Sequence, residues 1–353
     1  MAQSVFRGVQ IKGVAAAVPQ VTVNNLADHV FCSEEDRKKI VDLTGVMGYR
    51  KAPAHLCSSD LCVAAAQPLL EGLQIDPKSI DGIIFSTMTP DYRVPSTACV
   101  LQDRLKCSTE VVAYDINMGC SGYVVGLYNA CAAMQGGGLK RVLLLAGDTQ
   151  TKLCHAGDKN VVFILGDGGT ATLLEANVNA EPITVELRTD GSRFQNLYVP
   201  CGGFRSPSDE SSRQVRERAD GGVRSDDHLY MNGMEIFKFS STDVVKSLAG
   251  FMEAGGLLPD HISYLFLHQA NKFMNDKIAG KLKFSKEKVP YSIGMYGNTG
   301  SASIPLTITH HFAGRKMSGR HRVLLCGFGV GLSWGMVDVV LDDIFTPAIV
   351  ECP

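Results

Sequence analysis

Residues 110–138 read EVVAYDINMGCSGYVVGLYNACAAMQGGG and combine three features of an α/β fold. Residues 110–117 are largely apolar and rich in β-branched side chains, which is typical of a buried strand. A turn flanked by glycines presents Cys120, and residues 121–134 are apolar nearly all round, which predicts a buried helix that the glycines at 136–138 end. The segment therefore predicts a strand, a turn and a helix enclosed in an α/β core.

Further strand-sized apolar runs lie at 80–88 (IDGIIFSTM), 141–147 (RVLLLAG) and 161–165 (VVFIL). Their near-continuous apolarity favours strands covered on both faces, as in a parallel or mixed sheet between helices. Residues 60–73 have the pattern of a helix. The fold class expected from these elements is α/β.

The second half of the chain repeats the scheme of the first half. RVLL at 141–144 recurs at 322–325, 181 positions later, and IDGIIF at 80–85 has a counterpart, ISYLFL, at 262–267, 182 positions later. Two similarities at nearly one offset predict a gene-duplicated pair of α/β halves, residues 1–175 and 176–353. A coincidence between buried strands of similar composition is the alternative.

Composition and charge exclude several classes of protein. The chain has 353 residues, 45% of them hydrophobic, which is enough for a large core and for two domains or two fused halves. A formal net charge of -2 gives no indication that the protein binds nucleic acid or an anionic membrane by electrostatic attraction. Residues 1–14 lack a secretory pattern, and no apolar run approaches the ~20 residues of a membrane helix, so we expect a soluble cytoplasmic protein.

The eleven cysteines are scattered singly through apolar segments. Cys57 and Cys62, the closest pair, have no second pair at matching spacing, so we expect no metal site. Most of the cysteines read as small buried hydrophobes in a reducing compartment.

Cys120 differs from the other cysteines in its setting. At a helix N-terminus, unpaired backbone N–H groups and the helix dipole favour a thiolate. The flanking glycines let a substrate carbonyl approach the backbone, where the N–H of Cys120 itself is a donor for an oxyanion. A buried structural cysteine is the alternative.

His268 and Asn298 are the candidate partners of Cys120. His268 follows the apolar run at 264–267 directly, and a polar residue at the carboxyl end of a strand lies where α/β sheets bind ligands. Asn298 lies in GNTGSASIP at 297–305, and by the 181-residue offset Cys120 corresponds to Ser301 of that loop. The Asn298 amide is able to donate to an oxyanion without competing for protons. A hydrogen-bonded structural histidine and a tight Gly-Asn turn are the alternatives.

Two other segments bear on a site. Residues 327–335 (GFGVGLSWG) permit close backbone approach, which is a weak signal by itself. Residues 201–230 are polar, charged and rich in Gly and Ser, which predicts a surface excursion or lid.

Together these features resemble the β-ketoacyl-acyl-carrier-protein synthase III family of the thiolase superfamily over essentially the whole chain. Besides the turn at Cys120, the resemblance rests on motifs at 44–46 (TGV), 95–99 (PSTAC), 165–169 (LGDGG), 231–238 (MNGMEIFK), 268–271 (HQAN), 297–299 (GNT) and 328–331 (FGVG). It implies a thiolase-like fold in which two duplicated α/β halves form a five-layered α-β-α-β-α core.

The resemblance also implies roles in catalysis. Cys120 would take an acyl group from a thioester, with the backbone N–H groups of Cys120 and Val330 lining the oxyanion hole. His268 and Asn298 would stabilise the enolate left by decarboxylation of a malonyl thioester, which attacks the acyl-Cys120 to give a 3-oxoacyl product. Substrate contacts are implied at Val94, Lys159, Gly233, Asn271 and Phe328, with Asn271 at the pantetheine arm.

The implied partners are a second copy of the chain and an acyl carrier protein. Substrates would be acyl and malonyl thioesters on coenzyme A or phosphopantetheine, with no metal or other cofactor, in fatty acid or polyketide biosynthesis. The loop at 93–96 would reach towards the acyl pocket of the partner subunit.

The chain departs from the family at the positions that would bind the nucleotide end of coenzyme A. Typical members carry a Trp and an Arg before the Thr-Gly of 44–45, and these positions fall at about Lys39 and Leu43 here. The Asp-Arg of many members is Asp158-Lys159. Losing an aromatic surface and a bidentate Arg predicts an acyl donor other than acetyl-coenzyme A, carried on an acyl carrier protein in a specialised pathway. The uncharged Val94 disfavours a Glu-assisted head-to-head condensation.

Three other functions compete with condensation. A non-decarboxylating acyltransferase of the same fold would pass the acyl group to an alcohol or amine, although Asn298 suits an enolate better. A non-catalytic partner subunit is disfavoured by the presence of Cys120, His268 and Asn298 together. A cysteine hydrolase is disfavoured because no third residue is evident to orient His268.

Overall fold

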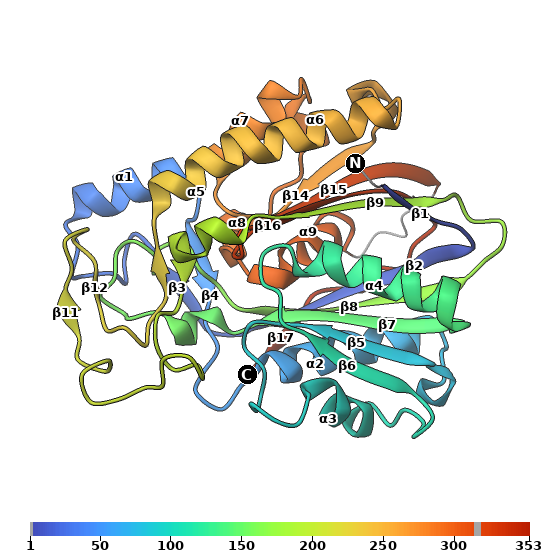
Figure 1. The fold of residues 1–353 in the computed structure, drawn as a ribbon, viewed down its shortest axis with the longest axis horizontal. Coiled ribbons are helices and arrows are strands. Elements are labelled where there is room, and N and C mark those ends of the chain that lie inside the picture. Colours follow the sequence, from blue (N-terminus) through green and yellow to red (C-terminus); the bar gives the residue numbers. More distant parts are fainter. Residues whose placement is uncertain (1–2, 314–318) are drawn as a thin grey trace.

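Two mixed β-sheets with helices between and outside them form the core of the computed structural model, which describes residues 3–313 and 319–353 (Figure 1). The first sheet has the order β17-β2-β8-β7-β5-β6. Its strands are β2 (Val9–Pro19), β5 (Gly82–Ser86), β6 (Val112–Ile116), β7 (Arg141–Asp148), β8 (Gly168–Ala176) and β17 (Val350–Cys352).

The second sheet has the order β1-β9-β16-β15-β14. Its strands are β1 (Ser4–Phe6), β9 (Ile183–Thr189), β14 (Tyr264–Leu267), β15 (Arg320–Gly329) and β16 (Ser333–Asp342). Short pairs are formed by β3 (Thr22–Asn24) with β4 (Gly48–Arg50), β10 (Leu197–Tyr198) with β13 (Tyr230–Met231), and β11 (Arg216–Glu217) with β12 (Val223–Arg224).

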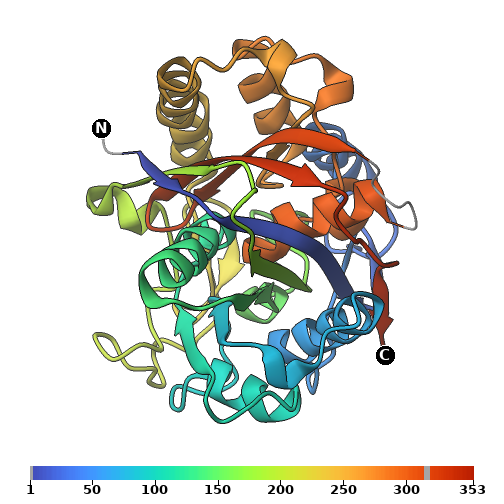
Figure 2. The same ribbon diagram turned by 90° about the vertical axis from the view of Figure 1, so that its right-hand side faces the viewer.

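Helices complete a five-layered arrangement of the predicted α-β-α-β-α kind (Figures 1 and 2). The middle layer is α4 (Gly122–Gly137) with α9 (Ser303–Phe312). The outer layers are α2 (Ser58–Gly72) with α3 (Thr97–Arg104) on the first sheet, and α6 (Val245–Ala254) with α7 (Lys272–Lys281) on the second. The remaining helices are α1 (Glu34–Thr44), α5 (Gly233–Phe239) and α8 (Ile293–Tyr296).

Successive side chains of each central strand point to opposite faces of its sheet, and this alternation explains the layers. In β7, Leu144 packs in the core shared with α4 and α9, whereas Leu143 and Leu145 pack in the core under α2. In β15, Leu325 faces the shared core and Leu324 the core under α6. Both strands are therefore buried on both faces, and this is why their sequences are continuously apolar.

The two sheets share one topology. The series β2-β8-β7-β5 corresponds to β9-β16-β15-β14, with two antiparallel pairings followed by a parallel one in each. The repeated RVLL lies in β7 and β15, and the similar stretches IDGIIF and ISYLFL overlap β5 and β14. The terminal strands cross over, since β1 joins the second sheet and β17 the first, so the red C-terminal strand lies beside elements of the blue end of the chain (Figure 2).

Most predicted elements are confirmed, and one is wrong. β5, β7, α2 and α4 lie within or close to the predicted ranges, and Gly138 ends α4 with a left-handed φ of 72°. β6 also forms where a strand was predicted, but the prediction that it is buried on both faces is wrong, because β6 lies at the edge of its sheet and none of its residues is fully buried. Residues 161–165 form successive turns instead of a strand, with the N–H of Leu165 bonded to the carbonyl of Val161 (3.2 Å). A run of five apolar residues cannot distinguish a buried turn from a buried strand, and here the carbonyl of Asp158 nucleates the turn.

None of the helices in residues 3–313 and 319–353 is both long enough and apolar enough to cross a bilayer.

Candidate active site

Cys120 lies in the turn between β6 and α4, in the centre of the molecule. Ser121 is the N-cap residue of α4, and its hydroxyl bonds that of Ser333 (2.6 Å), which in turn donates to the carbonyl of Val330 (2.7 Å). These bonds hold the cysteine turn of the first half against the β15–β16 turn of the second half.

The sulfur of Cys120 is buried and surrounded by backbone. Only 7% of the residue is exposed, and the backbone N–H groups of Val330 and of Cys120 itself act to lower the pKa of the thiol. Burial raises the pKa of the thiol to about 11, against the opposing effect of these two N–H groups. Both backbone groups predicted to line the first oxyanion hole therefore influence the Cys120 thiol.

Two glycines allow this backbone to approach. A Cβ atom on Gly329 would lie 2.6 Å from the Cys120 sulfur, and one on Gly119 would lie 2.2 Å from the Met88 sulfur. Since real Cβ contacts are longer than about 3 Å, no other residue fits at either position without displacing the turn.

His268 follows β14 directly and is almost fully buried, at 1% exposure. Its Nδ1 lies 2.7 Å from the Ser303 hydroxyl, and its carbonyl accepts a hydrogen bond from the Asn275 amide (3.0 Å). Burial lowers the pKa of the imidazole to about 3, and a hydrogen bond with the backbone of Gly300 acts in the opposite direction. The ring is therefore neutral at physiological pH and held by residues on several elements.

Asn298 has an oriented side chain. Its Oδ1 accepts the backbone N–H of Gly300 (3.0 Å), and its own N–H donates to the carbonyl of Ile164 (2.8 Å). Because a backbone N–H must face the amide oxygen, the NH₂ group points away from Gly300. Gly300 thus holds both His268 and Asn298.

The three candidate residues meet around β15 and the first turn of α4. A Cβ on Gly327 would lie 3.1 Å from the Cys120 carbonyl oxygen, and the next residue, Phe328, stands perpendicular to the His268 ring with centroids 5.5 Å apart. Gly122 of α4 abuts Ser301, which follows Gly300. The loop of Asn298 therefore adjoins the cysteine turn, as the repeat offset predicted.

A cavity of about 620 Å³ is lined partly by residues of the 201–230 segment. Gly119, which precedes Cys120, lines it together with Val330 and Gly331. Apolar side chains on its walls include Met88, Leu153, Val199 and Leu229, and polar ones include Asn117, Cys201 and Asp227. Apolar walls with a few polar side chains suit the binding of an acyl chain.

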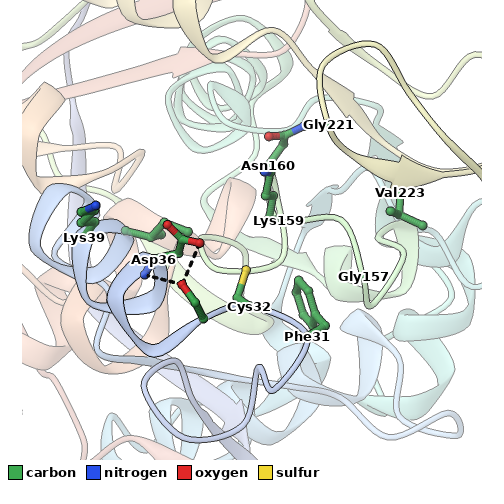
Figure 3. Close-up of a pocket in the computed structure, with 11 residues that line it drawn as sticks. Phe31, Cys32, Asp36, Lys39, Gly157, Lys159, Asn160, Gly221 and Val223 are labelled. Carbon is green, nitrogen blue, oxygen red and sulfur yellow. Dashed lines mark hydrogen bonds between the residues drawn. The ribbon is translucent and has the colours of Figure 1, made fainter.

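A second cavity, of about 570 Å³, opens at the surface between α1, residues 157–160 and the β11–β12 segment (Figure 3). Lys39 and Lys159, two of the residues at which the chain departs from the family, both line it. Leu43 is exposed and is not among its lining residues. Phe31, 48% exposed, supplies an aromatic face from a position that the sequence reasoning did not consider.

The predicted surface excursion at 201–230 is anchored by Arg224. This buried guanidinium lies between Asp158 (3.2 Å) and Asp220 (2.6 Å) and 4.8 Å above the Tyr230 ring. The excursion thereby forms a fixed wall of the second cavity.

The other predicted substrate contacts lie in different settings. Asn271 is the N-cap residue of α7, with its Oδ1 accepting the N–H of Met274 (2.7 Å). Gly233 begins α5 at the surface, Val94 is 83% exposed, and Phe328 is buried against His268.

Three functional neighbours of the site were missed by sequence reasoning. Ser303 hydrogen-bonds His268, Gly300 donates to Asn298, and Asp148 accepts the N–H of Ser301, although the sequence offered no third residue to orient His268. Ser303 and Gly300 lie within the 297–305 motif. The sequence therefore marked this loop, but it did not show which of its residues contact His268 and Asn298. Asp148 carries no motif and ends β7.

The fold and the site together define a class of protein: an acyl-transferring enzyme of the thiolase-like kind. Comparison with known proteins agrees. The family described as 3-oxoacyl-[acyl-carrier-protein (ACP)] synthase III matches residues 114–191, and its C-terminal counterpart matches residues 252–340. The chain belongs to the 3-oxoacyl-[acyl-carrier-protein] synthase III family and is a ketoacyl synthase III-like condensing enzyme.

Relatives match over nearly their full lengths. The β-ketoacyl-[acyl-carrier-protein] synthase III of Streptococcus gordonii is 33% identical over 336 residues, 94% of this chain and 99% of the relative. The solved 3-oxoacyl-(acyl-carrier protein) synthase of Burkholderia xenovorans LB400 is 36% identical, covers 99% of both chains and has a TM-score of 0.93. A priming β-ketosynthase of the R1128 polyketide pathway is 25% identical over 96% of this chain and 97% of its own, with a TM-score of 0.82.

Proposed function

We propose that the chain performs a two-step decarboxylative Claisen condensation at Cys120. In the first step the Cys120 sulfur attacks the carbonyl of an acyl thioester, the carrier thiolate leaves, and it takes up the proton that the cysteine loses. The N–H groups of Cys120 and Val330 stabilise the tetrahedral oxyanion. The product is an acyl-Cys120 thioester.

In the second step a malonyl thioester loses carbon dioxide, and the electron pair of the broken C–C bond forms an enolate. The Asn298 NH₂ and the neutral His268 ring donate to its oxygen. Donation from the ring requires the tautomer in which the Ser303 hydroxyl donates to Nδ1 and the ring proton is on Nε2. The enolate carbon attacks the acyl-Cys120 carbonyl, and departure of the thiolate releases a 3-oxoacyl thioester. The steps require no metal or organic cofactor.

We propose that the cavity lined by the 201–230 segment holds the acyl chain. The second cavity would be the entrance through which the phosphopantetheine arm of the carrier reaches Cys120. Lys159 and Asn271 would contact the phosphopantetheine, Phe328 would support His268, and Gly233 and Val94 would border the substrate path. The lysines at the mouth suit a phosphate of the phosphopantetheine arm. Because the chain lacks the family's Trp and Arg at about Lys39 and Leu43, we propose an acyl carrier protein as the donor in preference to acetyl-coenzyme A.

We also propose that a second copy of the chain completes the enzyme. Val112 on the edge strand β6 is 49% exposed, and Tyr92 and Val94 are exposed on the neighbouring loop, so an apolar surface is available for a partner. The described cysteines are free thiols, which suits a reducing compartment such as the cytoplasm. Light scattering after size exclusion would test the dimer, since a monomeric mass at micromolar concentration would refute it.

The close approach of the β15 backbone at Gly327 and Gly329 to the buried Cys120 carries the proposal. Intact-protein mass spectrometry with a panel of acyl-coenzyme A and acyl-carrier thioesters tests it, with Cys120→Ala as control. A Cys120-dependent mass gain, followed by loss of that mass and appearance of a 3-oxoacyl product when malonyl-carrier is added, is the expected result. Mass gain that only an alcohol or amine discharges would identify the non-decarboxylating acyltransferase instead. An unchanged mass with every donor would refute the proposal.

A further inference from the structure

Asp148 is a buried carboxylate that no step of the proposed reaction uses. It is the last residue of β7 and has no exposed surface. Its Oδ1 accepts the backbone N–H of Met88 (2.7 Å) and the hydroxyl of Thr87 (3.2 Å). Its Oδ2 accepts the backbone N–H and the hydroxyl of Ser301, each at 2.8 Å.

These bonds join the two halves of the molecule beside the reacting groups. Thr87 and Met88 follow β5 of the first sheet, whereas Ser301 lies in a turn that precedes α9 in the second half. A Cβ on Gly300 would lie 2.4 Å from Oδ2 of Asp148, and Gly300 has a left-handed φ of 61°. The carboxylate therefore rests directly on the residue that holds His268 and Asn298.

Activation of Cys120 does not explain a carboxylate at this position. The negative charge of Asp148 raises the pKa of the Cys120 thiol, which opposes formation of the thiolate. A carboxylate is, however, the side chain with enough acceptor sites for four donors from two directions. The carboxylate of Asp148 therefore suits the four hydrogen bonds that it accepts, and it does not favour ionisation of Cys120.

We propose that Asp148 is a positioning residue for the condensation step, acting through Gly300 to hold His268 and Asn298 where the enolate oxygen forms. It does not contact the substrate. Asp148 has this role only if the proposed condensation is the reaction, so the two half-reactions must be measured separately.

Asp148→Asn is the direct test. One oxygen of Asp148 faces the Met88 N–H and the other faces the Ser301 N–H, so either orientation of the amide sets its NH₂ group against a backbone donor. We expect release of carbon dioxide from malonyl-carrier to fall at least about 100-fold, while the rate of Cys120 acylation falls less than about tenfold. Parallel losses in the two half-reactions, or unchanged release of carbon dioxide, would overturn the proposal.

Asp81→Asn is the matched control. Asp81 directly precedes β5 and lies at the opposite end of β7 from Asp148. There its Oδ2 accepts the N–H groups of Lys140 and Arg141 at 2.9 Å, and a single amide oxygen is able to keep both. Neither half-reaction should change by more than about twofold in this variant.

Ser301→Ala keeps the proposal testable if Asp148→Asn does not fold. It removes the hydroxyl donor to Asp148 and leaves the backbone N–H. We expect about a tenfold loss of carbon dioxide release with unchanged acylation, and an effect on both rates or on neither would overturn the assignment. A wild-type enzyme that acylates Cys120 but never decarboxylates malonyl-carrier would instead refute the proposed function.

Discussion

Gly329 lies against Cys120 so closely that a Cβ atom on the glycine would stand 2.6 Å from the sulfur. The glycine comes from β15 of the second half, and the cysteine comes from the turn before α4 of the first half. The backbone of one half thus forms a wall beside the cysteine of the other. The backbone N–H of the next residue, Val330, acts to lower the pKa of the same thiol.

Gly329→Ala should therefore disable acylation. The added methyl group must displace the sulfur from its two N–H donors, and a φ of 155° disfavours alanine as well. We expect the acylation rate measured by mass gain to fall about 100-fold or more. Gly250→Ala is the control, because a Cβ there meets nothing within 4 Å, and it should retain full activity. Normal acylation of the Gly329 variant would contradict the packing described here.

Asn298→Asp should separate the two half-reactions. The aspartate retains an oxygen for the Gly300 N–H but replaces the NH₂ donor by a negatively charged acceptor that repels the enolate. One oxyanion donor is worth about 3–4 kcal/mol, so condensation should slow about 100- to 1000-fold while Cys120 still acquires an acyl group. Loss of acylation to the same degree would show that Asn298 serves the first step instead.

The reactivity of Cys120 should depend steeply on pH. Burial raises the pKa of its thiol to about 11, so the thiolate fraction grows as the pH rises towards that value. Alkylation of Cys120 by iodoacetamide should accelerate about tenfold per pH unit between pH 6 and 9, once the background of the Cys120→Ala variant is subtracted. A plateau below pH 8 would mean that the N-terminus of α4 and the two N–H groups outweigh burial.

Arg224→Met should destabilise the protein. Removing the guanidinium leaves the buried Asp158 carboxylate without its cation, and breaking a buried pair costs about 3–5 kcal/mol. Arg320→Ala, which removes the more exposed pair with Glu181, should cost about 0–1 kcal/mol. Equilibrium unfolding in urea measures both, and equal losses would contradict the burial of the Arg224 cluster.

Much of the fold could be predicted because its signals are local. The apolar strand, the glycine turn and the apolar helix around Cys120 lie within 29 consecutive residues, and each element follows from side-chain periodicity. The repeated RVLL predicted two central strands that occupy equivalent positions in the two sheets. Periodicity failed at 161–165, where a run of five apolar residues was too short to separate a turn from a strand.

By itself, the sequence determined the class of fold, the nucleophile candidate and the loops that carry its partners. Only the tertiary structure decided that Ser303 and Gly300 hold His268, that Asp148 bridges Met88 and Ser301, and that Phe31 lines the second cavity. Asp148 and Ser301 are 153 positions apart. Contacts of this kind depend on how two sheets and their loops pack, and a periodic pattern within one segment contains no information about which distant segment it will meet.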